Sequence, residues 1–163
     1  MELKKLIETA ATEAGFLDDL LVLLERESVE LGNIDINGMD VSNQAKELLI
    51  RKISGHSPSL QQAVSACSVR EGLPSSTSLV ALAEHFSKKG NKELLLIQKQ
   101  MSKTADKIKQ AAALNQEVAE RFAAMVTTSL GLITRLVNQS NVYGASGGYQ
   151  QQRTSAVMIN REA

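Results

Sequence analysis

The longest apolar pattern in the chain recurs every seven residues from residue 91 to residue 141. One position of the repeat holds Leu94, Met101, Ile108, Asn115, Phe122, Ser129 and Leu136. The second position holds Ile97, Ala111, Val118, Met125 and Leu132, flanked by Ala105, Ala112, Ala119, Val126 and Ile133. A seven-residue period places these side chains on one face of a single α-helix. At ~1.5 Å per residue this helix would be on the order of 75 Å long, several times the usual helix length.

A helix of this length exceeds the width of a compact domain of 163 residues. Two arrangements can accommodate a helix of this length. Either the protein is an elongated coiled coil, or part of the helix projects and binds a partner.

A second long helix is predicted at the start of the chain, over residues 2–31. One seam position of its heptad frame holds Leu3, Ala10, Leu17, Leu24 and Leu31. Glu13 and Glu27 interrupt the apolar stripe, so the predicted seam is imperfect. A connector rich in turn-forming residues follows at residues 35–40.

A third long helix is predicted over about residues 40–71. Pro58 is expected to kink or interrupt it near residues 55–58, because proline lacks the N–H donor and clashes with the preceding turn. Residues 72–76 contain glycine and proline and should break the helical structure. A short amphipathic helix is then expected at about residues 77–89.

Together these patterns predict an all-α fold. It would be an elongated antiparallel bundle of three long helices with coiled-coil-like packing, a short extra helix and a flexible C-terminal tail. Aromatic residues are 3% of the chain and Trp is absent, so the core must consist of Leu, Ile, Val, Ala and Met. We expect the bundle to span residues 1–141. Residues 142–163 lack helical periodicity and hold three glycines, which is typical of a flexible tail.

Charge is distributed unevenly, although the net charge is zero. Residues 1–35 carry a balance of −6, and residues 73–163 carry +5. The interpretation we favour is an acidic first helix lying against a basic later helix. The alternative is nucleic-acid binding through Lys88, Lys89, Lys92, Lys99, Lys103, Lys107 and Lys109. Arginine is scarce there and no aromatic residue interleaves with the lysines, so a solvated face is the better interpretation.

Residue types that carry catalysis or bind metals are few. Cys67 is the only cysteine, which excludes an intrachain disulfide, and its small neighbours favour a buried structural thiol. His56 and His85 lack metal-ligand spacing; we expect His56 in a loop and His85 on a helix surface or bundle edge. Their roles stay open. These observations predict a protein that is not an enzyme and needs no metal or cofactor.

Targeting and membrane signals are also missing from the sequence. The N-terminus has no apolar core ending in small residues, and no stretch of 18 apolar residues occurs. With a single cysteine, this pattern suits a cytoplasmic protein without membrane insertion.

Asn115 is the most unusual residue of the long repeat, because it places an amide at an apolar seam position. Such a residue commonly fixes the register of packed helices at a cost in stability. The other interpretation is that this part of the face is not buried in the free protein.

Beyond Asn115 the apolar positions share one helix face, because they follow helical spacing. We predict a surface that binds another protein's helices there, formed by Val118, Phe122, Met125, Val126, Leu132, Ile133 and Leu136. The alternative is that the second helix covers these residues and they are simply bundle core.

Four short motifs, in order along the chain, resemble one known family. The first is the leucine-rich segment 20–27, which closes in Leu31-Gly32, and the second is Lys46-Glu47-Leu48-Leu49. The third is Leu114-Asn115, where Val118 replaces the second Asn of the family's Asn-x-x-Asn. The fourth and most specific is Tyr143-Gly144-Ala145-Ser146-Gly147. In these motifs the sequence resembles the FlgN-like family, which are export chaperones for the hook–filament junction proteins of the bacterial flagellum.

The resemblance implies a cytoplasmic type III flagellar export chaperone. Such a protein binds the C-terminal helical segments of the hook-associated junction proteins, prevents their premature assembly and delivers them to the membrane export gate. It implies that Tyr143, Gly144 and Gly147 of the tail bind the export gate. The main alternative is a self-associating coiled-coil structural or adaptor protein. The preferred junction protein and the oligomeric state stay open.

Overall fold

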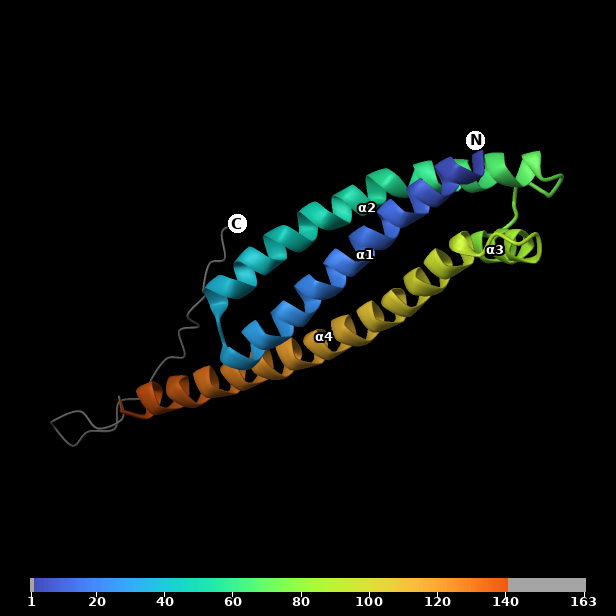
Figure 1. Ribbon diagram of the computed structural model, residues 1–163. Helices are drawn as coiled ribbons and strands as arrows, with labels where there is room; N and C mark the ends of the chain where they lie inside the picture. The colour runs from blue at the N-terminus through green and yellow to red at the C-terminus, as the bar shows by residue number, and fades with distance from the viewer. Residues whose placement is uncertain (1, 141–163) are drawn as a thin grey trace, which may run out of the picture. The chain divides into compact units, whose positions relative to one another are not determined.

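The computed structural model describes residues 2–140, with side chains to residue 135. It contains four helices: α1 (Glu2–Asn33), α2 (Ile36–Arg70), α3 (Leu79–Lys88) and α4 (Glu93–Ser140). The described residues form no strand, so the predicted all-α fold, with three long helices and one short helix, is confirmed (Figure 1). The chain divides into two compact units after Glu120. The first unit contains α1, α2, α3 and the first part of α4. The predicted boundary between bundle and tail, at residues 141–142, stays a prediction.

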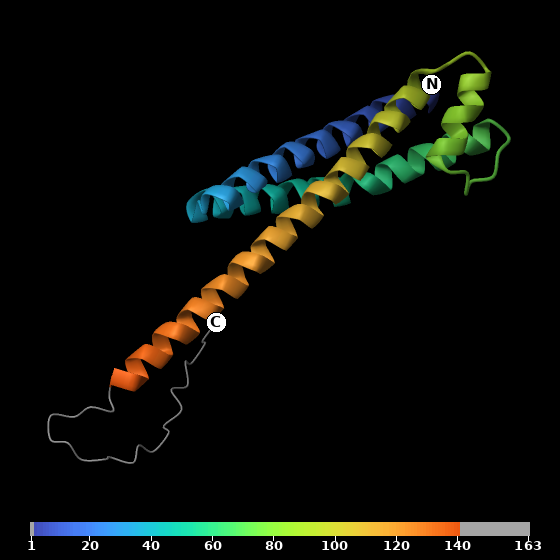
Figure 2. The ribbon, with the colours of Figure 1, turned by 90° about the horizontal axis from the view of Figure 1, so that it is seen from below.

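In the first unit, α1 and α2 form an antiparallel pair that lies side by side along its length (Figures 1 and 2). Only Ile34 and Asp35 connect the two helices, and Ile34 adopts a left-handed φ of 56°. Asp35 caps α2, because its Oδ1 accepts a hydrogen bond of 2.9 Å from the backbone N–H of Gly38. The predicted connector over residues 35–40 was therefore wrong: the cap lets α2 begin at Ile36.

Pro58 lies inside α2, which continues through it to Arg70. The predicted interruption near residues 55–58 was wrong, and so was the placement of His56 in a loop. Contacts with α1 explain the difference. Glu13 is buried and accepts a hydrogen bond of 2.9 Å from the Ser57 hydroxyl, and its other oxygen lies 2.6 Å from His56 Nδ1. These contacts with α1 thus keep the residues directly before the proline in a helical conformation.

The apolar core of the first unit lies where the start of α1, the end of α2, α3 and the start of α4 meet. Its buried members are Leu6, Ala10, Ala63, Val64, Cys67, Leu82, Ala83, Phe86 and Leu94. The short helix α3 is fixed at its start by the Ser78 hydroxyl, which accepts a hydrogen bond from the backbone N–H of Ala81. Cys67 is 2% exposed, and burial raises the pKa of its thiol. Its placement in the core is as predicted.

Gly38 provides a test of the tight α1–α2 connection. A Cβ at this position would lie 2.5 Å from Asp35 Oδ2 and 3.1 Å from Glu30 Cδ. Both carboxylates are held by hydrogen bonds, so neither can move away without loss. We therefore expect Gly38→Ala to lower the free energy of unfolding by about 1 kcal/mol, the usual value of a helix cap.

The matched control is Gly55→Ala, in the interior of the same helix. Nothing lies within 4 Å of a Cβ there, so the better helix propensity of alanine should leave stability unchanged or raise it by up to about 1 kcal/mol. Urea unfolding followed by circular dichroism measures both. Equal stability of the two variants would contradict the constraint at Gly38.

Candidate functional site

The first part of α4 runs parallel to α1, and polar side chains join the two helices. Asp18 on α1 accepts hydrogen bonds from Thr104 Oγ1 at 2.9 Å and Gln100 Nε2 at 2.8 Å. Thr104 is 7% exposed, so this contact is formed away from bulk water. The buried Thr104 hydroxyl and its half-buried partner Asp18 stabilise one register of the two helices, because a shifted register would leave the hydroxyl unpaired.

Asn115 forms the second polar contact between α4 and α1. It is 5% exposed, and its Nδ2 donates to the Leu24 carbonyl oxygen and to Glu27 Oε2, both at 2.9 Å. Its Oδ1 accepts a hydrogen bond of 2.5 Å from the Ser28 hydroxyl. Asn115 is therefore buried and fully hydrogen-bonded, so the idea that its local face is unburied was wrong; its role in fixing the register stays a prediction.

Glu27 connects this contact to the third long helix. Its second carboxylate oxygen, Oε1, forms an ion pair with Lys46 of α2, and both side chains are largely buried. Nearby, Glu30 Oε1 accepts hydrogen bonds from Ser42 Oγ at 2.9 Å and from Arg26 Nε at 2.7 Å. Glu27, which interrupts the apolar stripe of α1, therefore links α1 to both α2 and α4.

The burial of the seam face changes along α4. Up to Asn115 the seam positions are buried or half-buried, beginning with Leu94 at 0% exposure. The predicted binding residues beyond it are more open. Phe122 is half-buried, and the exposed members are Val118 at 36%, Val126 at 39%, Leu132 at 55%, Ile133 at 56% and Met125 at 57%. The side chain of Leu136 lies outside the described residues.

We name the distal stripe as Val118, Phe122, Met125, Val126, Leu132 and Ile133. The structure brings these residues onto one face of one helix, as their spacing predicts. It also adds Leu130, which is 58% exposed and lies one helical turn from Val126. Sequence reasoning missed Leu130 because it occupies neither heptad position, although its four-residue spacing was visible.

The distal stripe contains only apolar side chains. No metal-binding group of His, Cys, Asp or Glu occurs among the residues that the structure describes. What the stripe can do chemically is bury apolar surface against another apolar surface.

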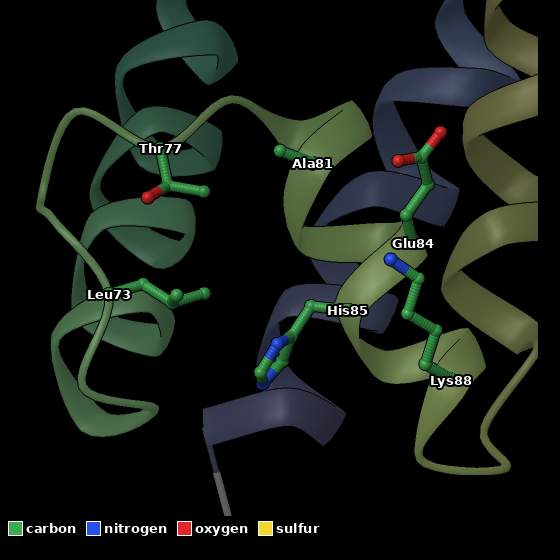
Figure 3. Close-up of a pocket in the computed structure, with 6 residues that line it drawn as sticks. All are labelled: Leu73, Thr77, Ala81, Glu84, His85 and Lys88. Atoms are coloured by element: carbon green, nitrogen blue, oxygen red, sulfur yellow. The ribbon is translucent and has the colours of Figure 1, made fainter.

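In the first unit, a pocket of about 400 Å³ lies between α3 and the loop before it (Figure 3). It is lined by Leu73, Thr77, Ala81, Glu84, His85 and Lys88. His85 also lies 3.1 Å from Glu71 at the end of α2. The hydrogen bond from Lys89, and to a smaller extent that from His85, lowers the pKa of Glu71. His85 thus lies at the bundle edge, where it holds α3 against the end of α2.

The acidic α1 lies against the first part of the basic α4, but none of the ion pairs described for residues 2–140 joins these two helices. Asp18 takes its partners from neutral Gln100 and Thr104, as described above. The lysines at 92, 99, 103, 107 and 109 are exposed and form no described ion pair. The charge asymmetry is therefore a property of the surface and not of the α1–α4 contact.

Two further predictions concern the membrane and the tail. Across residues 2–140, none of the helices combines the length and the apolar character that a membrane span requires. Tyr143, Gly144 and Gly147, predicted to bind the export gate, lie outside the described residues.

Comparison with known proteins identifies one family. The family described as FlgN protein matches residues 1–151, which is most of the chain. No curated protein and no solved structure matches. The family match covers α1 to α4 and extends through the tail motif.

Asn115 provides the test of the polar contact. Asn115→Ala removes three hydrogen bonds and leaves the Leu24 carbonyl and Glu27 without their α4 partner. We expect a loss of about 1–3 kcal/mol in the free energy of unfolding, the range for a buried polar group left unpaired. Gln116→Ala is the control, because its only described bond is an exposed one to Glu120, and it should change stability by less than about 0.5 kcal/mol. Equal losses in both variants would show that Asn115 does not hold α4.

Proposed function

The chain belongs to the FlgN family, and from this we propose that it binds the C-terminal helical segments of hook–filament junction proteins in the cytoplasm and delivers them to the flagellar export gate. Membership of the family makes it a flagellar export chaperone. The cargo, the delivery step and the cellular location are the proposal.

The exposed distal stripe is the observation that carries the cargo proposal. Isolated apolar residues are common on protein surfaces, but several of them grouped on one helix face indicate an interaction site. Met125, Leu132 and Ile133 of the stripe, and Leu130 beside them, are each more than half exposed. A row with this spacing fits the apolar face of another helix through i, i+3, i+4 and i+7 contacts.

The physical role of this contact follows from the nature of the cargo. An apolar helix destined for assembly outside the cell must not assemble inside it. Covering its face with the distal stripe removes apolar surface from water, at roughly 25 cal/mol per Å² before ordering costs. No nucleotide, metal or other cofactor takes part, and we propose that the protein is not an enzyme.

A substitution in the distal stripe tests cargo binding. Met125 and Ile133 are 57% and 56% exposed, so replacing both with serine should barely change helicity or melting temperature. If cargo packs on them, the affinity for a junction-protein C-terminal segment should fall by at least about tenfold, since burying each such side chain contributes roughly 1.5–3 kcal/mol. Titration calorimetry with that segment measures the loss.

The matched control is Val22→Ser with Val29→Ser, which removes two equally exposed apolar residues (62% each) from α1. Cargo affinity should be unchanged in this variant. Unchanged affinity in the distal-stripe variant would refute the proposed surface. Light scattering on the same samples tests the alternative of self-association: wild-type oligomers that dissociate only in the distal-stripe variant would favour a self-associating coiled coil.

Tyr143 tests the delivery step. The family resemblance links the tail tyrosine to the export gate, and its ring and hydroxyl offer both an apolar and a polar contact. We expect Tyr143→Ala to reduce export of junction proteins while their affinity for the chaperone stays the same. Export and affinity are measured in the same variant, with Tyr149→Ala as the control. Normal export in Tyr143→Ala would remove the delivery role.

A further inference from the structure

A row of lysines follows the outer face of the first part of α4. Lys92, Lys99, Lys103 and Lys107 are exposed, and Leu96 lies among them at 67% exposure. Their spacing of four, three, four and four residues places all five on one side of the helix. We call these five residues the basic face.

The basic face points away from α1. The face of α4 that meets α1 holds Leu94, Thr104 and Asn115, and at about 100° per residue the lysines lie on the opposite side of the helix. None of the four lysines has an ion-pair partner in residues 2–140. Their charges are therefore available to an external anionic surface.

The residue types on the basic face indicate which anionic surface it fits. Lysine is a compact, hydrated charge on a flexible stem, whereas nucleic-acid readout favours the planar fork of arginine and stacking aromatic rings. The basic face has neither arginine nor aromatic residues. A cluster of four lysines on one helix face is what binds anionic lipid headgroups, and the exposed Leu96 between them adds an apolar side chain to the same face.

We propose that the basic face of α4 binds the surface of an anionic phospholipid membrane. The four lysines lie against the headgroups, and Leu96 enters the interface between them. The contact is peripheral and reversible, because each lysine near such a surface strengthens binding by only about fivefold. It is independent of the proposed cargo surface, which occupies a different part of α4.

Vesicle co-sedimentation of the purified full-length protein tests this inference. The probes are vesicles with about one third phosphatidylglycerol in phosphatidylcholine, and vesicles of phosphatidylcholine alone. We expect binding to the anionic vesicles only, weakening as salt is raised because salt screens surface charges. The variant Lys92→Gln, Lys99→Gln, Lys103→Gln should bind about a hundredfold more weakly, by the same per-lysine factor.

The matched control is Lys4→Gln, Lys5→Gln, Lys52→Gln, which removes three exposed lysines from α1 and α2. It should bind anionic vesicles nearly as well as the wild type, and circular dichroism should be the same for all three proteins. Three results would overturn the proposal: no binding of the wild type to anionic vesicles at low salt, equal weakening in both variants, or tighter binding to a short nucleic-acid duplex than to the vesicles.

Discussion

The heptad face of α4 is the feature on which this structure depends. Within the first unit this face packs on α1 and on the apolar core, and its seam positions from Leu94 to Asn115 are buried or half-buried. Of the six residues of the distal stripe, five are exposed and only Phe122 is half-buried.

The covered part of α4 is held in two different ways. Near Leu94 it joins an apolar core that supplies most of the burial in the first unit. At Thr104 and Asn115 it is held by hydrogen bonds to Asp18, Glu27 and the Leu24 carbonyl. Apolar packing stabilises without fixing a register, whereas buried polar pairs fix the register with a smaller net gain. The polar pairs thus determine which residues of the first part of α4 face α1.

The sequence predicted α1 and α4 because each has a strong seven-residue period. The cargo-binding role of the distal stripe, which continues that period, stays a prediction. The Asp35 cap reaches only three residues along the chain, to Gly38, and was interpreted as part of a turn. Two features were beyond the reach of the sequence. Glu13 holds the residues before Pro58 through contacts that form only after folding. The partners of Asn115 lie almost ninety residues away along the chain. Local propensity cannot reveal such long-range pairs, which here override the expected breaks.

Hydrogen exchange of the full-length protein, alone and with a junction-protein C-terminal segment, tests most directly whether α4 has one covered part and one cargo-binding part. The amides of residues 94–115 should be protected in the free protein and change little with cargo, because α1 already packs on them. The amides of residues 118–135 should gain protection only when cargo is present. Cargo-induced protection confined to residues 94–115, or none on α4, would contradict the account.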